Sequence, residues 1–527
     1  MRSCMLSILV SILSISTSAA FAGSRGSINS INTNINTNTH THKRTPRVRF
    51  FGRPASSSLS VATTEVVSID DSTTATTTTT TTSNKWEDLQ KAIAPSDDEQ
   101  EPVKEPVLTF YRDTNGWCPF CLRVWVCIRA KNLPYQERLI PLQNKPDWYK
   151  DMVPTAQTPA LLFHHSGDFD GDGDGDGAGD GDGAGDAVSN KSRKLVWDSL
   201  DIMKALDDMF PDTRQLVLDT DEYKQASEMN AQLNKVGFAF TYASRPSTEA
   251  GAPELTPSEK KQAFLDQLDV LEQALALQQN SSNGNGPFRL GKEFTGVDAE
   301  MIPSLERWRY QLPLSKDVDI LEGRPALKIW FEAMEAFEPF GERASGDEYS
   351  WIATNVQFAR IFGKEGDADT MAQIEKSESA AFKLVDGFRD AFAVKDDECE
   401  GRFALEAAAK VISNHAGIAK DCTNGDPKSQ KNISRAASVE TAEKMLLVVA
   451  RILLKGDDAV KEARSITKAS LLEDMGFVVG DGDDERLDAA NAAKTVATRL
   501  CAPRDMSAPA AKILRAVLMI VAEKLEE

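Results

Sequence analysis

Two cysteines separated by two residues are the part of the sequence best suited to chemistry. Cys118 is followed by Pro119, Phe120 and Cys121, and the broad apolar pattern beyond them predicts a helix that begins here. The first N–H groups of a helix are unpaired and its dipole is positive at this end, so both stabilise a thiolate. Thiol pKa values at such positions fall from about 8.5 to roughly 3.5–7.5. We therefore predict that Cys118 is the nucleophile and that Cys121, one turn further along, resolves a mixed disulfide on it.

The Cys-x-x-Cys spacing could instead be half of a structural zinc site, which needs two further ligands. The chain has no second close cysteine pair, and His164 and His165 are expected on the far side of the predicted sheet. We therefore expect no metal. Seven cysteines in 527 residues do not form a disulfide framework either, so cysteine chemistry should be local. Four other cysteines are predicted to be packing or structural residues: Cys127, Cys399, Cys422 and Cys501.

The segments around this pair predict an α/β domain over residues 105–211. A strand, a helix and a second strand come first, and two further strands and a helix follow. This order is that of a thioredoxin-like fold. The predicted strands are 107–111, 133–142, 157–163 and 194–197, and the last helix is 198–209.

An insertion of alternating Asp and Gly, within residues 167–190, separates the last two predicted strands. A calcium loop of the EF-hand type needs a Glu in its last position, and no Glu occurs between Glu137 and Glu222. We expect a solvated, disordered hairpin tip, and weak association with divalent cations stays open.

Helical periodicity replaces the strand pattern from Asp212 onward. Residues 212–348 predict an all-α domain, in which Thr295 and Asp298 form a capping pattern before an apolar run. Residues 349–527 predict a further helical extension, rich in Ala and Leu and without a catalytic cluster. We expect this extension to pack on the rest of the chain or to dimerise it.

The charge balance and the N-terminus bear on partners and on location. Eighty acidic residues against 60 basic ones give a net charge of −20, which argues against binding of nucleic acid.

Residues 1–20 predict a signal peptide, with an apolar stretch too short to cross a bilayer. Residues 21–104 predict a transit-like segment followed by a disordered linker. The signal peptide joined to this transit-like segment resembles the bipartite presequence of algae with secondary plastids. We expect a plastid protein, with secretion as the alternative.

The region from Val107 to about Gly346 resembles the glutathione S-transferase superfamily. Its cysteine-type classes (omega, lambda and dehydroascorbate-reductase-like) fit best, on Cys118-Pro119-Phe120-Cys121, Thr158-Pro159 and Asp198-Ser199 in this order. The resemblance implies that glutathione is the co-substrate and that Pro159 is cis. It also implies roles in glutathione binding for Pro119, Phe120, Lys145, Thr158, Pro159, Asp198 and Ser199.

These observations together predict a glutathione-dependent thiol transferase or reductase. Cys118 would form a mixed disulfide with glutathione, and Cys121 or a second glutathione would resolve it. Three alternatives stay open: a non-catalytic scaffold, an isomerase of the prostaglandin-synthase type, and an iron–sulfur cluster shared between two subunits. A homodimer is possible. The segments 346–351 and 503–507 look like parts of extended plant and algal glutathione-transferase-like proteins, without a role that the sequence defines.

Overall fold

The protein is described from a computed structural model. The described residues are 86–93, 106–164, 194–241, 255–280, 286–362, 367–388, 394–395, 398–423, 435–477 and 483–527. The predicted signal peptide, most of the segment 21–104 and the Asp/Gly insertion lie outside them.

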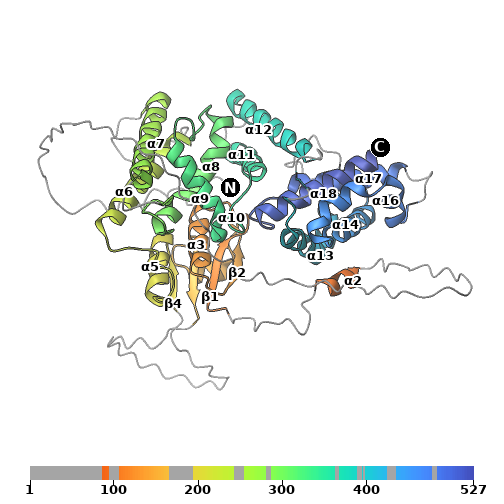
Figure 1. Cartoon of the computed structure of the whole chain (residues 1–527), viewed down its shortest axis with the longest axis horizontal. Helices are drawn as coiled ribbons and strands as arrows, with labels where there is room; N and C mark the ends of the chain where they lie inside the picture. The colour runs from red at the N-terminus through yellow and green to blue at the C-terminus, as the bar shows by residue number, and fades with distance from the viewer. Residues whose placement is uncertain are drawn as a thin grey trace, which may run out of the picture. The chain divides into compact units, whose positions relative to one another are not determined.

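A four-stranded mixed sheet forms the centre of the first domain (Figure 1). Its order is β2-β1-β3-β4, with β1 parallel to β2, β3 antiparallel to β1, and β4 antiparallel to β3. This topology confirms the predicted thioredoxin-like fold. The strands are β1 (Leu108–Asp113), β2 (Tyr135–Ile140), β3 (Ala160–Phe163) and β4 (Lys194–Trp197).

Helices cover both faces of this sheet, because side chains alternate between its two faces along each strand. Leu108 and Phe110 of β1 join the core formed with α3 (Pro119–Ala130) and α5 (Ser199–Met209). Tyr111 of β1 belongs to a separate core on the other side, which includes Tyr149 of α4 (Asp147–Met152). The sheet therefore fixes where α3 begins and where the loop before β3 lies.

An all-α domain follows, and its helices pack on the same core as α3 and α5. The predicted capping box is present, since Asp298 accepts a hydrogen bond from the backbone N–H of Thr295 at 3.0 Å. Its other oxygen accepts one from Trp330 Nε1 at 2.9 Å, which ties two helices together. The helices are α6 (Asp221–Thr241), α7 (Pro257–Asn280), α8 (Gly296–Ser315), α9 (Pro325–Ala336) and α10 (Glu338–Gly341).

The rest of the chain is a helical extension with a core of its own. Its last helix is buried on nearly every side, as expected for the central helix of a bundle. None of the described helices is long and apolar enough to cross a bilayer. The helices are α11 (Glu348–Phe362), α12 (Ala368–Gly387), α13 (Gly401–Thr423), α14 (Val439–Leu453), α15 (Ala459–Ser465), α16 (Lys468–Asp474), α17 (Asp483–Arg499) and α18 (Ala508–Glu526).

A short helix, α2 (Trp86–Ala92), packs on this extension. Leu89 is buried in the core of the extension, and the Trp86 ring stacks on His415 with 3.9 Å between ring centroids. The prediction of a linker that buries nothing is therefore wrong for these residues. Few apolar residues surround them in the sequence, so the pattern gave no helix signal; the partner that orders them lies more than 300 residues away.

The two segments without a role, 346–351 and 503–507, lie at the junction between the extension and the second domain. The guanidinium of Arg515 is fully buried there; it pairs with Asp347 and donates to Leu500 O at 2.7 Å. Ser350 Oγ accepts a hydrogen bond from the backbone N–H of Ala502 at 2.9 Å.

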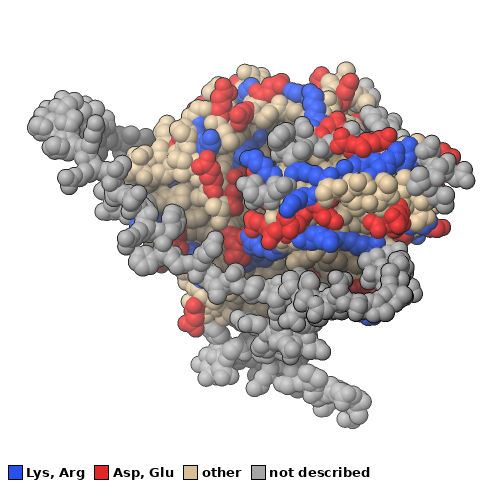
Figure 2. Space-filling view, turned by 45° about the vertical axis from the view of Figure 1, so that its right-hand side comes forward, with Lys and Arg blue, Asp and Glu red and all other residues tan. Residues whose placement is uncertain are grey.

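The surface carries charges of both signs on the face that Figure 2 shows, where Lys and Arg side chains lie between Asp and Glu side chains.

A cavity of about 770 Å³ lies at this junction, lined by residues of α8, α9, α11, α12 and α18. Glu306 of α8 is buried at its wall and accepts a hydrogen bond from the backbone N–H of Gly346 at 2.8 Å. Burial raises the pKa of Glu306 to about 7, because the charged carboxylate is poorly solvated there.

Glu306→Gln should remove a pH-dependent loss of stability. Between pH 4.5, the ordinary pKa, and about 7 the native state holds a proton that the unfolded chain releases, so the free energy of unfolding falls as the pH rises. The loss amounts to at most about 3 kcal/mol and is complete above the raised pKa. Gln keeps the acceptor for Gly346. Thermal unfolding should therefore show the variant gaining stability relative to the wild type between pH 5 and pH 8. The same pH dependence of stability in both proteins would contradict the prediction.

Candidate active site

Cys118 is the residue that precedes the first turn of α3, directly after the loop that leaves β1. Its backbone is extended, with φ −73° and ψ 116°, and its sulfur accepts a hydrogen bond from the backbone N–H of Cys121 at 3.4 Å. Pro119 occupies the first helical position, where a missing N–H costs nothing. The Cys118 residue is half-buried, so part of it stays exposed to solvent.

The peptide bond between Thr158 and Pro159 is cis, as the resemblance implies. These residues immediately precede β3, so the predicted strand 157–163 begins three residues too early. The Cys118 thiol lies 3.7 Å from Thr158 O. Tyr149 Oη donates to Gln157 O at 2.6 Å and so fixes the same loop. A backbone edge therefore runs beside the sulfur.

The two thiols have opposite proton affinities. The hydrogen bond with the Cys121 side chain is the main cause that lowers the pKa of Cys118, and the N–H groups of Cys121 and Phe120 add to it. Burial and the charge of Asp113 oppose this effect. Burial raises the pKa of Cys121 well above its ordinary value, and the negative Cys118 sulfur raises it further. Cys118 is thus the thiolate of the pair and Cys121 the thiol.

Alkylation of Cys118 by iodoacetamide should follow a titration with a midpoint below the ordinary thiol pKa of 9.0. Only the thiolate reacts, so a lowered pKa moves the whole rate profile to lower pH. Mass spectrometry of the peptide that contains Cys118 gives the rate at each pH. The peptide with Cys501 is the internal control, since burial raises the pKa of that thiol. A Cys118 midpoint at or above 9.0 would contradict the geometry.

Lys145 lies in the loop before α4, in electrostatic reach of both sulfurs. Burial lowers the pKa of Lys145, and the negative charges of Cys118 and Cys121 oppose this change. The ammonium group is half-buried, so a small anionic molecule beside Cys118 could meet it without displacing other groups.

Asp198 and Ser199 form the start of α5, across from α3. Asp198 has a positive φ of 91° and accepts hydrogen bonds from the N–H groups of Leu200 and Asp201, so it caps the helix. Ser199 is buried and accepts from Arg123 Nη1 at 2.7 Å. Both residues are therefore already engaged within the protein, and Arg123 links α3 to this corner.

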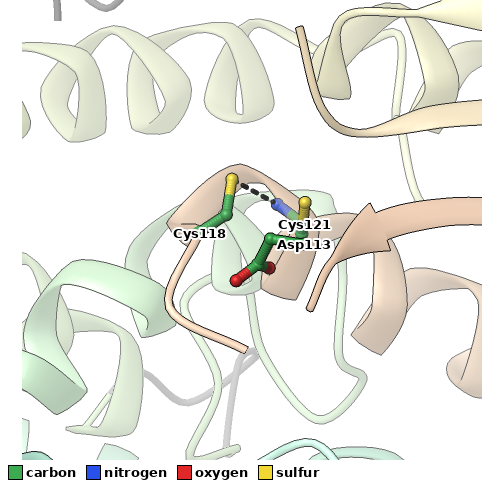
Figure 3. Close-up of side chains that lie close together, drawn as sticks. All are labelled: Asp113, Cys118 and Cys121. Atoms are coloured by element: carbon green, nitrogen blue, oxygen red, sulfur yellow. Dashed lines mark hydrogen bonds between the residues drawn. The ribbon is translucent and has the colours of Figure 1, made fainter. Parts of the chain in front are cut away.

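Asp113 is a residue of the site that the sequence analysis does not identify. It is the last residue of β1 and fully buried, and one of its oxygens and the two sulfurs all lie within 4.8 Å of one another (Figure 3). An acidic residue that ends a strand just before a nucleophile is the signal that could have identified it. These three groups could ligate a metal ion; a structural zinc site of four protein ligands would need one more than this cluster of described residues supplies.

The loop before Cys118 also touches the helical extension. A side chain at Gly116, whose φ is 68°, would lie 3.5 Å from Arg504 N and Pro503 Cγ. Arg343 donates to Pro503 O at 2.7 Å and lies over the Trp125 ring of α3. The extension therefore contacts the elements that hold Cys118.

The fold and the site resemble those of the glutathione S-transferase superfamily. Residues 117–209 match the family described as "Glutathione S-transferase, N-terminal domain". This match confirms the resemblance to the superfamily for the domain that carries Cys118.

The chain is also similar to individual proteins. The chain is similar to "Glutathione S-transferase L2, chloroplastic" of Arabidopsis thaliana, with 28% identity over 263 residues, 46% of this chain and 70% of that protein. It is also similar to "Glutathione S-transferase DHAR3, chloroplastic" of the same plant, with 24% identity over 225 residues, 43% and 68%. A Chlamydomonas reinhardtii dehydroascorbate reductase structure aligns at 20% identity and a TM-score of 0.32, covering 52% of this chain and 98% of that one.

Proposed function

We propose that the protein is a glutathione-dependent thiol transferase or reductase. The observation that carries the proposal is the Cys118 sulfur: it has a lowered pKa, precedes a helix, and lies 3.7 Å from Thr158 O. The relatives named above are glutathione S-transferases, which supports the same class of activity.

Glutathione is the co-substrate in this proposal. It is a small anionic peptide, so the exposed edge at Thr158 and the positive charge of Lys145 suit its backbone and its carboxylates. Pro119 and Phe120 would lie beside its sulfur, and Pro159 would hold the edge in place. Asp198 and Ser199 would face its γ-glutamyl end through their backbone and the outer oxygen of Asp198, since their inner contacts are occupied.

In the reaction, the Cys118 thiolate attacks a glutathionylated substrate at the glutathione sulfur. The bond between that sulfur and the substrate breaks, the substrate leaves as a thiolate, and Cys118 holds glutathione in a mixed disulfide. A second glutathione thiolate then restores Cys118 and leaves as glutathione disulfide. Alternatively Cys121 displaces the bound glutathione and forms a disulfide with Cys118, which two further glutathione molecules reduce. A thiolate nucleophile favours this exchange over conjugation of electrophiles, which needs a hydroxyl that leaves the glutathione thiolate free.

The test is to assay the purified chain with glutathione and either hydroxyethyl disulfide or dehydroascorbate. We expect turnover with at least one of them, and a glutathione adduct on the Cys118 peptide by mass spectrometry. Absence of both turnover and adduct would refute the proposal.

We also propose that the protein acts in a plastid. Two relatives are named chloroplastic, and the N-terminal sequence supports such delivery. A fluorescent fusion carrying residues 1–104 should accumulate in plastids of an alga with secondary plastids; secretion of the fusion would favour the alternative. A homodimer stays a prediction.

A further inference from the structure

The cavity of about 770 Å³ at the junction has the size and the lining of a small-molecule site. Such sites have volumes of roughly 300–1,000 Å³ and mostly apolar or aromatic walls. Three exposed residues of its lining, Lys383, Gly387 and Lys512, place its mouth at the solvent. A ligand with an aromatic or aliphatic body could therefore enter and be enclosed. Aromatic side chains from both the second domain and the extension line the cavity: Tyr310, Phe331, Phe340, Tyr349, Phe388 and Phe403.

Glu306 brings a buried carboxylate to this wall with one oxygen unused. The residue is 4% exposed, and its Oε1 accepts the backbone N–H of Gly346 at 2.8 Å. Its Oε2 has no hydrogen bond within the part of the chain that the structure describes. The Trp351 Nε1–H lies close enough to lower the pKa of Glu306, but it makes no hydrogen bond of normal geometry to either oxygen. A buried acceptor without a donor costs stability.

The contacts of Glu306 within the protein do not account for its charge. A glutamine oxygen would accept the hydrogen bond from Gly346 equally well. Arg307, whose charge lowers the pKa of Glu306, directs its guanidinium at the backbone oxygens of Pro303 and Trp117. A buried carboxylate is stable only when a donor or a cation satisfies it, so Glu306 is suited to a partner that the chain does not supply.

The charges of the cavity wall favour a cation as that partner. Six of the charged lining residues are acidic and three are basic, so the wall stays negative even though Arg515 neutralises Asp347. Among the basic residues, Arg309 Nη1 already lies 2.5 Å from Glu335 Oε1, and the two lysines are exposed at the mouth. An anionic ligand would be repelled on average, whereas a cation would be attracted.

We propose that this cavity binds a small organic amine, whose ammonium group donates to Glu306 Oε2 while its apolar body packs on the aromatic wall. The ammonium supplies the missing donor, and the carboxylate gains the cation that its burial requires. Burial of the body against the rings supplies most of the remaining affinity. The inference does not depend on the proposed function, because none of the lining residues belongs to the site around Cys118.

Three naphthalene probes of nearly equal shape test the charge preference. They are 2-(1-naphthyl)ethylamine, 2-(1-naphthyl)ethanol and 1-naphthaleneacetate, titrated into the full chain at pH 8 by isothermal titration calorimetry. At this pH Glu306 is mostly ionised. The amine should bind roughly 10- to 100-fold more tightly than the alcohol, and the acetate least. Binding of the acetate as tight as that of the amine, or no binding of the amine, would overturn the inference.

Glu306→Gln tests the residue that carries the charge. Gln keeps the acceptor for Gly346, so the fold should be retained, which circular dichroism checks. The variant should bind the amine roughly 10- to 100-fold more weakly and the alcohol as the wild type does. Glu332→Gln is the matched control: this exposed residue of α9 lies outside the lining and should leave the affinity for the amine unchanged. Unchanged amine binding by Glu306→Gln would overturn the inference.

Gly387→Trp tests the place of binding. A Cβ at Gly387, the last residue of α12, meets no atom within 4 Å, so a large side chain there fills the mouth without displacing the helix. This variant should lose affinity for both the amine and the alcohol by at least about 10-fold, and Gly387→Ala should bind both normally. Wild-type binding by Gly387→Trp would overturn the location.

Two further measurements separate this site from the one around Cys118. Saturating glutathione should not displace the amine, and Cys118→Ser should bind it with wild-type affinity. Displacement by glutathione would place the probe beside Cys118 and overturn the inference. A chain that binds the amine but shows no thiol transfer defeats the proposed function alone.

Discussion

Replacing Cys118 by serine should lower kcat/KM for hydroxyethyl disulfide by at least about 1,000-fold. A hydroxyl cannot form the mixed disulfide, and the proposed reaction has no other route through this site. The variant should fold normally, because the side chain is half-buried and a serine oxygen also accepts the hydrogen bond from the Cys121 N–H. Initial rates with glutathione at several substrate concentrations give the comparison.

Two other cysteine variants serve as controls for this result. Cys501→Ser changes an equally half-buried cysteine in the extension and should keep the wild-type rate. Cys121→Ser should keep turnover wherever a second glutathione resolves the intermediate, so its rate should depend more strongly on glutathione concentration. Full activity of Cys118→Ser would refute the assignment of the nucleophile.

Arg515→Met should destabilise the chain by about 3–5 kcal/mol. The Arg515 side chain is fully buried and bonded to Asp347, Ser350 and Leu500, so its loss leaves a poorly solvated carboxylate and unpaired acceptors. Urea unfolding followed by circular dichroism measures the change. The effect should include looser attachment of α18 to α11, which limited proteolysis detects as new cleavage sites near the junction.

A double variant separates charge burial from packing. In the double variant Arg515→Met and Asp347→Asn, the carboxylate charge that Arg515→Met leaves unpaired is removed. The Asn oxygen can still accept the hydrogen bond from the Ser350 N–H, so part of the lost stability should return. Lys224→Met, at an ion pair on the surface, should leave the unfolding midpoint unchanged. A single Arg515→Met variant as stable as wild type would contradict this account of the junction.

Local rules predicted most of the first domain and the placement of Cys118. A short apolar strand before the cysteine pair, a proline directly after Cys118 and a strand near Thr158-Pro159 are short-range signals. The structure brings Cys118 and Thr158 together as the fold requires. Asp113 was missed because its role depends on burial, which a turn-like sequence of polar residues conceals. The cause of the low Cys118 pKa was also incomplete, since the Cys121 side chain contributes more than the helix start.

Helical periodicity predicted most helices of the extension but not what they contact. The pairing of Asp347 with Arg515 joins residues 168 positions apart, and no local pattern encodes such a contact. The same is true of α2, whose tryptophan finds its partner at His415. Helices pack by fitting the side-chain ridges of one into the grooves of another, which depends on the three-dimensional surface. The sequence therefore predicted helices in the extension but not which of them contact one another.

The turn at Pro503 lies beside Gly116, in the loop from which the nucleophile projects. We therefore expect a cut or a mutation that loosens the C-terminal bundle to change the rate at which the Cys118 thiol reacts. On this expectation the added helices support the domain that carries the nucleophile.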